Sequence, residues 1–550
     1  MTGSATAAER PRHALGWTAR RLGLDRFELG CLVILAGVSL TFLGPLLTRG
    51  RSLSGADGLY PADQLQYLAW IREASHHWLI GNRFDLTPGG RPFLHPGYLL
   101  SGLLNRATGL SIPASYLLWK PFAVVVTFAG SLAYVRRFFP TGGRSRAALA
   151  IVLFAVMPAC AIVAWTGWGG NPRAYTFDFI SGEMWTGQYL WGYLMTAIAV
   201  FLMPLVLLAV ESWRGQRGAL RLWLAATGAL IVTWLQPWQG ATLAVIVVAV
   251  EAVRYARVRE RPPWRLALVP VAAALPALYY AVLQASDHSW RLAADANAAG
   301  SQPSWHWPWW GIVLTVLPLA APAALAYRLP AREWQDLAVR VWPLAALAVF
   351  LQPGGTFPYH AFQGLAMPLG VLAVQGATSF PRWRPRPALV IAAMGLLVLP
   401  GFAHKVQLAR NNEHSGNYPY FIAGGELRAV DWLEDDPRPG GVLAPTYSGF
   451  FVPYTTGRET YVGALSWSPH YRRRHLLAEA LFSGRLTGAP ARAFVRSTHA
   501  RFLFADCRGL SNLTPELGPL LASVERFGCA TVYVLRERPY MTRAAGRPDA

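Results

Sequence analysis

Long apolar stretches constrain this chain more than any other feature of its sequence. A helix needs about 20 apolar residues to cross a bilayer. The stretches that are almost free of charge are 31–48, 147–165, 188–210, 219–235, 238–253, 266–284, 309–327, 341–351, 361–378 and 387–403. A further span is expected within 112–135, where Lys120 and Pro121 interrupt the pattern. We therefore predict a polytopic α-helical membrane protein with about eleven transmembrane helices.

The charge pattern separates a membrane protein from a nucleic-acid-binding one. The net charge is +21, but only 14% of the residues are charged and 53% are hydrophobic. Average soluble domains carry about 25% charged residues. Arg residues cluster near 10–26, 136–146, 214–221, 254–265, 328–340 and 382–386, whereas the alternate short loops hold only Arg173 and Arg291. This alternation follows the positive-inside rule, so we expect no nucleic-acid partner.

The same alternation predicts the topology. Residues 1–29 are expected to be cytoplasmic, 30–403 to form the transmembrane domain with an external loop at 49–111, and 404–550 to be extracytoplasmic. The first 29 residues are polar, so no cleaved signal peptide is expected. The predicted location is the plasma membrane, with the lipid bilayer as the first partner.

The C-terminal region alternates helix and strand signals, which is typical of a small α/β domain. Helices are expected at 424–435, 470–482, 489–498 and 515–526, and strands at 441–445, 459–462, 501–505 and 530–536. The segment 443–458 is expected to form a Tyr-rich turn after a strand and to cap the entrance of a site on the outer side. Cys507 and Cys529 follow or end predicted strands, and either a disulfide or two buried thiols fits this pattern.

Carboxylates concentrate in the external loops, whereas the spans hold almost no charge apart from Lys120. A transporter or flippase would normally place several ionisable groups at mid-membrane. Residues 61–79 are predicted to form an amphipathic helix on the membrane surface, with Leu65, Leu68, Ile71 and Trp78 near one face. A site at the outer surface suits a substrate with a lipid tail and a polar head.

Several stretches carry a resemblance to a known family. They are residues 63–84, 95–104, 109–122, 236–240 (QPWQG), 358–370 (PYHAFQGLAMPLG) and 427–474. Together they resemble the GT-C superfamily of membrane glycosyltransferases, in particular bacterial homologues, of actinobacterial type, of polyprenyl- or dolichyl-phosphate-mannose protein mannosyltransferases. The resemblance implies inverting transfer of a sugar from a polyprenyl-phosphate donor. The acceptor would be a cell-wall glycan, lipid or protein at the outer face.

The resemblance also implies a carboxylate in the first external loop that acts as a base, or that holds a metal in some members. Asp63 matches the family position, although an acid in the first turn of a helix also favours the helix dipole. Asp57 is the second candidate, although its Asp-Gly pair is a common turn signature. These two acids are not adjacent, as they are in some members. The identity of the base and a divalent metal therefore stay open, and no other cofactor is implied.

Two cations are candidates for the donor phosphate. Lys120 would lie in the outer part of its span, where snorkelling towards lipid headgroups is the alternative. Arg173 lies in the second external loop, where an exposed loop charge is the alternative. Asp178 and Glu183 are candidates for binding sugar or acceptor hydroxyls. Two competing functions remain at this point, a flippase of lipid-linked glycans and a non-catalytic cell-envelope scaffold.

Overall fold

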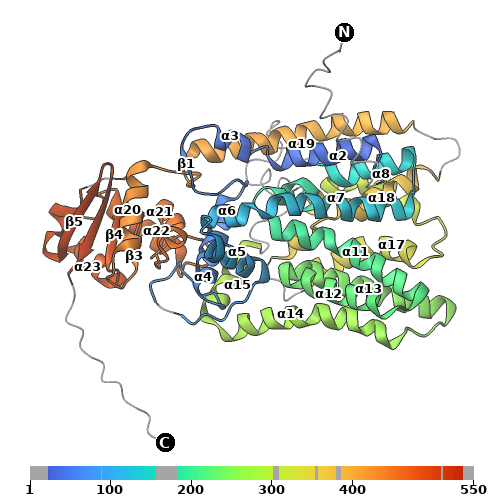
Figure 1. Ribbon diagram of the computed structural model, residues 1–550, viewed down its shortest axis with the longest axis horizontal. Coiled ribbons are helices and arrows are strands. Elements are labelled where there is room, and N and C mark those ends of the chain that lie inside the picture. Colours follow the sequence, from blue (N-terminus) through green and yellow to red (C-terminus); the bar gives the residue numbers. More distant parts are fainter. Residues whose placement is uncertain are drawn as a thin grey trace, which may run out of the picture.

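The computed structural model describes residues 23–87, 89–156, 182–301, 309–352, 357–379, 386–509 and 512–536. A bundle of apolar helices runs along the long axis, and a mixed helix and sheet domain, called the tail domain below, lies at one end (Figure 1). The helices α4 (Pro61–His76), α5 (Pro96–Thr108) and α15 (His288–Ser301) lie between these two parts. The fold class predicted from the sequence, a polytopic helical protein with a small C-terminal α/β domain, is confirmed.

The bundle helices follow the apolar stretches of the sequence. They are α2 (Arg26–Ser39), α3 (Leu43–Leu47), α6 (Ile112–Leu117), α7 (Trp119–Phe138), α8 (Gly143–Phe154), α11 (Leu194–Gln216), α12 (Ala219–Leu235), α13 (Pro237–Val258), α14 (Leu268–Ser286), α16 (Trp309–Ala326), α17 (Trp334–Leu351), α18 (Ala366–Ala377) and α19 (Pro387–Ser415). Within the described residues, five helical segments are long and apolar enough to cross a membrane: 112–138, 194–216, 264–286, 334–351 and 388–415. Large apolar side chains such as Leu278 and Leu396 are exposed on their outer faces, as contact with lipid requires.

The Arg-rich loops lie at one end of the bundle, where ion pairs link neighbouring helices. Arg136 pairs with Glu28 of α2, and Arg137 pairs with Glu211 of α11. Arg214 pairs with Glu251 of α13. This end lies opposite the tail domain (Figure 1), which is the arrangement that the alternation of Arg clusters predicts.

Residues 49–111, called the first loop below, are packed against the tail domain. Strand β1 (Ser52–Leu53) pairs antiparallel with β2 (Phe421–Ile422). Helix α4 (Pro61–His76) packs against α5 (Pro96–Thr108) on one side and α21 (Thr446–Thr456) on the other. The Tyr454 hydroxyl donates a hydrogen bond to the Ser54 carbonyl at 2.7 Å. The helix expected at 61–79 ends at His76, and most of its residues are buried against neighbouring elements.

The tail domain contains a four-stranded sheet in the order β3-β4-β6-β5. Strand β3 (Val442–Leu443) is parallel to β4 (Phe502–Ala505), whereas β6 (Ala530–Leu535) is antiparallel to both β4 and β5 (Leu521–Phe527). The surrounding helices are α20 (Gly424–Asp435), α21, α22 (Tyr471–Phe482), α23 (Gly488–Thr498) and the short α24 (Thr514–Leu517). A disulfide joins Cys507 and Cys529, with a Cα–Cα distance of 4.8 Å.

Three expectations for the tail domain were wrong in part. The helix expected at 515–526 ends at Leu517, and β5 follows, because Gly528 with φ +71° allows a tight turn into β6. The turn expected at 443–458 is mostly helix α21. The strand expected at 459–462 makes only one bridge, from Thr460 to Val442.

Candidate active site

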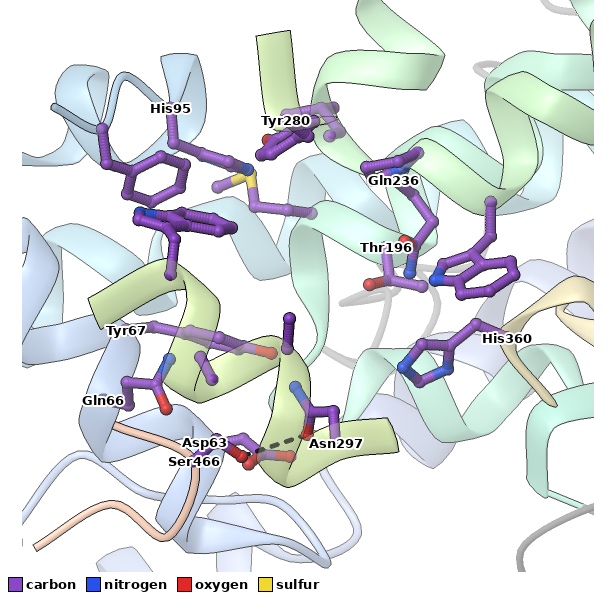
Figure 2. A pocket seen from close by; sticks show the side chains of 18 of the residues that line it. Asp63, Gln66, Tyr67, His95, Thr196, Gln236, Tyr280, Asn297, His360 and Ser466 are labelled. Atoms are coloured by element: carbon purple, nitrogen blue, oxygen red, sulfur yellow. Dashed lines mark hydrogen bonds between the residues drawn. The ribbon is translucent and has the colours of Figure 1, made fainter. Parts of the chain in front are cut away.

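A cavity of about 590 Å³ lies where the bundle, the first loop and the tail domain meet (Figure 2). Helix α4 contributes Asp63 and Tyr67, and the turn η4 (Pro358–Phe362) contributes His360. The tail domain contributes Ser466 and Trp467. The bundle wall consists of apolar and amide side chains: Met195, Leu235, Gln236, Pro237, Trp238, Ala241, Ala277, Ala281 and Gln284. The cavity therefore presents an apolar side and a polar side to one ligand.

Asp63 faces this cavity from the first turn of α4, where Pro61 starts the helix. The Tyr193 hydroxyl donates a hydrogen bond to Oδ2 of Asp63 at 2.7 Å. Enclosure by the cavity walls raises the pKa of the Asp63 carboxyl, and the Tyr193 hydrogen bond and His360 work in the opposite direction. A carboxylate with a raised pKa is a stronger base, and the open side of this one is accessible to a ligand.

His360 points into the cavity from η4, on a different wall from Asp63 (Figure 2). Its Nδ1 lies 3.2 Å from Oε2 of Glu183 and 3.0 Å from Nε2 of Gln363. The Glu183 contact requires a hydrogen on Nδ1, whereas the Gln363 amide nitrogen could donate only to an unprotonated Nδ1; we assign the hydrogen to Nδ1 because Glu183 is the charged partner, which leaves Nε2 available to the cavity. Glu183 is buried and does not line the cavity, so it orients His360, whereas we predicted that it contacts a sugar.

Aromatic side chains form the part of the cavity nearest the tail domain. The ring of Trp467 packs edge-on against Trp70 and Trp290, with centroid distances of 5.2 Å in both cases. His95 stacks on Tyr98, and burial lowers the pKa of His95 to about 3, so this imidazole is neutral. His95 also lines the cavity. Flat rings of this kind suit a sugar face.

Asp57 and Lys120 do not reach the cavity. Oδ2 of Asp57 and Nζ of Lys120 form an ion pair at 2.6 Å, and both side chains are buried. Nζ also donates to the Leu190 carbonyl at 2.6 Å and to the Ser39 carbonyl at 3.1 Å. Neither residue lines the cavity, so the geometry does not support Asp57 as a base or Lys120 as a phosphate ligand.

Two predicted site residues cannot be placed, and two residues of the cavity were not predicted. Arg173 and Asp178 lie outside the described residues. Across the described parts of the chain, no group of three or more His, Cys, Asp and Glu side chains is arranged to hold a metal ion. The sequence reasoning did not single out Tyr193 or His360. His360 and Gln236 stand within two of the stretches that carry the family resemblance, and that signal could have identified them.

No family model matches the chain, and no curated protein matches it. The chain is similar to the crystal structure of the oligosaccharyltransferase of Archaeoglobus fulgidus in complex with Zn and sulfate. That match has 14% identity and a TM-score of 0.48, and covers 87% of this chain and 68% of the other.

A second similarity is to ArnT from Cupriavidus metallidurans bound to undecaprenyl phosphate. It has 13% identity and a TM-score of 0.44, and covers 94% of this chain and 98% of the other. A third is to the oligosaccharyltransferase AglB from Archaeoglobus fulgidus with an inhibitory peptide and a dolichol-phosphate. This match has 12% identity and a TM-score of 0.45, and covers 88% and 69%. Because these TM-scores are below 0.5, no residue role is transferred from these proteins.

Proposed function

We propose that this chain is a membrane glycosyltransferase of GT-C type that transfers a sugar from a polyprenyl-phosphate donor to an acceptor hydroxyl. The observation that supports this best is the position of Asp63. Its carboxylate faces a 590 Å³ cavity that is built jointly by apolar bundle helices, an external loop and the tail domain. A donor with a lipid tail and a sugar head needs a site of this mixed character. The resemblance in residues 63–84 and 358–370 points to the same reaction.

The proposed step uses Asp63 as the general base. The acceptor oxygen forms a bond to the anomeric carbon of the sugar while the bond from that carbon to the phosphate oxygen breaks. Asp63 takes the hydroxyl proton, and the polyprenyl phosphate leaves with the electron pair. Attack from the side opposite the leaving group inverts the anomeric centre.

His360 is the proposed partner of the leaving phosphate. Its ring lies in the cavity wall, and Glu183 stabilises a hydrogen on Nδ1. Nε2 can then donate to a phosphate oxygen when the ring is protonated, which stabilises the charge that develops on the leaving group. The Tyr193 hydroxyl holds Asp63 in its position. Arg173, although outside the described residues, stays a proposal for the same phosphate.

The proposed location of the reaction is the outer face of the plasma membrane. The Arg-rich loops lie at the end of the bundle opposite the cavity, and the positive-inside rule assigns that end to the cytoplasm. The Cys507–Cys529 disulfide of the tail domain fits an oxidising compartment. The acceptor is proposed to be a cell-wall glycan, lipid or protein.

Replacing Asp63 by Asn tests this function. Membranes that contain the protein are supplied with undecaprenyl phosphate-[¹⁴C]mannose or -[¹⁴C]glucose, and transfer of label into other products is counted. Asp63→Asn keeps the shape of the side chain and removes the base, so the rate should fall by about 10²–10⁴.

Asp295→Asn is the matched control, because Asp295 is exposed on α15 (His288–Ser301) and does not line the cavity. It should transfer label at the wild-type rate. Full transfer by Asp63→Asn would refute the proposed base. Movement of labelled donor across the membrane without transfer would favour the flippase.

A further inference from the structure

The buried ion pair of Asp57 and Lys120 lies just behind the proposed base. Asp57 belongs to the loop that precedes α4, and Lys120 is the second residue of α7. Their side chains are 1% and 5% exposed, and neither lines the cavity. A buried pair of this kind is costly to form, and removal of one partner leaves an uncompensated charge. Its hydrogen bonds show which segments it holds.

Asp57 connects the ion pair to the helix that carries Asp63. Oδ1 of Asp57 accepts a hydrogen bond from Nε2 of Gln64 at 2.9 Å, and the Asp57 backbone N–H donates to Oε1 of Gln64 at 2.9 Å. Gln64 directly follows Asp63 in the first turn of α4. Asp57 therefore fixes the turn that aims the proposed base.

Lys120 connects the ion pair to the segment that carries Tyr193. Nζ of Lys120 donates to the carbonyl of Leu190, which ends the turn η1 (Thr186–Leu190). The Tyr116 hydroxyl holds the next part of this segment through the Gly192 carbonyl at 2.7 Å. Tyr193 follows and donates to Asp63. Lys120 therefore holds the hydrogen-bond donor of the base.

The segment around Asp57 and Gln64 is in direct contact with the segment that carries Tyr193. Gly192 has φ +92°, and a Cβ on this residue would lie 2.8 Å from Oε1 of Gln64. A Cβ on Gly58 would lie 2.5 Å from the Trp191 carbonyl oxygen. These two segments leave no free space between them, so a shift of one must displace the other.

We infer that Asp57 and Lys120 are positioning residues, which hold the Asp63–Tyr193 hydrogen bond from both of its sides. This inference rests on the proposed function. It assigns no contact with substrate to either residue. It predicts that loss of Lys120 lets the Leu190–Tyr193 segment move away from Asp63, while the donor-binding part of the cavity keeps its shape.

The test separates positioning from stability by means of a double variant. Lys120→Met leaves Asp57 buried without its cation, so it should lower both stability and kcat. The double variant Asp57→Asn with Lys120→Met removes both charges and should recover stability, but it cannot restore the bond to Leu190. A misplacement of about 1 Å costs roughly 10²-fold in rate. The double variant should therefore keep a kcat roughly 10- to 100-fold below wild type, with the donor KM unchanged.

The pH profile gives a readout that a purely structural role would not move. The groups that interact electrostatically with Asp63 are Tyr193, His360, Glu183 and, on its own helix, Tyr67. The Tyr193 hydrogen bond lowers the pKa of Asp63, so its weakening should raise that pKa and move the acid limb of kcat to higher pH. Glu251→Gln is the matched control, since Glu251 is buried in an ion pair at the opposite end of the bundle. It should leave the acid limb in place.

Hydrogen exchange of the full-length protein in nanodiscs gives a readout that does not depend on activity. Peptides that cover 58–67 and 188–195 should exchange faster in the double variant than in wild type, and Glu251→Gln should not change them. Wild-type kcat and wild-type exchange in the double variant would overturn the inference. If exchange of both peptides is faster in the double variant but the wild-type protein transfers no sugar, the result would instead refute the proposed function.

Discussion

The two ends of the helical bundle bury charged groups in different ways. At the Arg-rich end, Arg214 pairs with Glu251, and Arg137 pairs with Glu211. The described cavity of 590 Å³ lies at the other end, where Asp63 faces open space and Asp57 is paired behind it. The comparison teaches that a buried charge by itself does not mark a site. A carboxylate that is enclosed by protein but open to a ligand is the stronger signal.

Replacement of His360 should give the largest effect among the tests of this contrast. His360→Gln removes the group that is proposed to donate to the leaving phosphate, so kcat should fall by roughly 10²–10³. Label transfer from undecaprenyl phosphate-[¹⁴C]mannose measures it. His414→Gln is the control, because His414 is exposed near the end of α19. Equal rates for His360→Gln and wild type would remove His360 from the mechanism.

Tyr193→Phe should have a smaller effect, because it keeps the ring and removes the hydrogen bond to Asp63. We expect kcat to fall roughly tenfold. Asp63 acts as a base only when it is deprotonated, so transfer is lost as the pH falls through its pKa. Removal of a hydrogen bond that lowers this pKa should move the acid limb to higher pH. A limb that moves to lower pH would contradict this assignment.

Trp467→Ala tests what the tail domain contributes to ligand binding in the cavity. Its ring closes the cavity against Trp70 and Trp290. Loss of the ring should raise an acceptor or donor KM by roughly threefold to tenfold, with kcat nearly unchanged. Trp432→Ala is a control in the tail domain, since Trp432 does not line the cavity. A drop in kcat without a change in KM would mean that Trp467 has another role.

Glu251→Gln should have the smallest effect on transfer. Glu251 accepts hydrogen bonds from Arg214 at 2.7 Å and from the Trp334 indole at 2.8 Å. Loss of its charge leaves Arg214 with Glu260 as its remaining acidic partner and should cost about 1–3 kcal/mol of stability, visible as earlier thermal unfolding. The rate of transfer at 25 °C should be unchanged. A slower rate would show that the two ends of the bundle are coupled.

Much of the fold could be predicted from the sequence, because apolar runs and Arg clusters report directly on helices in a membrane. The helix of α20 was predicted at its observed bounds, 424–435. The error at β5 arose because its residues have weak periodicity, and pairing with β6 decided their conformation. The sequence could not show that α21 would cover α4, because that contact joins segments about 390 residues apart.

The candidate site was predicted less completely. Asp63 could be named because its place in the first turn of a loop helix matches the family resemblance. The sequence placed Asp57 in a loop turn and Lys120 in a span, and only the three-dimensional contact between the loop and α7 pairs them. Tyr193 and His360 come from distant segments, and no local pattern reveals that they meet at one cavity.

A structure of the protein in nanodiscs with added undecaprenyl phosphate tests the central claim most directly. We expect the phosphate to lie in the cavity within hydrogen-bond reach of Nε2 of His360. Asp63 should lie about one sugar ring away, and the lipid tail should leave along Leu235, Pro237 and Ala277. A phosphate bound outside this cavity, with Asp63 and His360 free of it, would contradict the account.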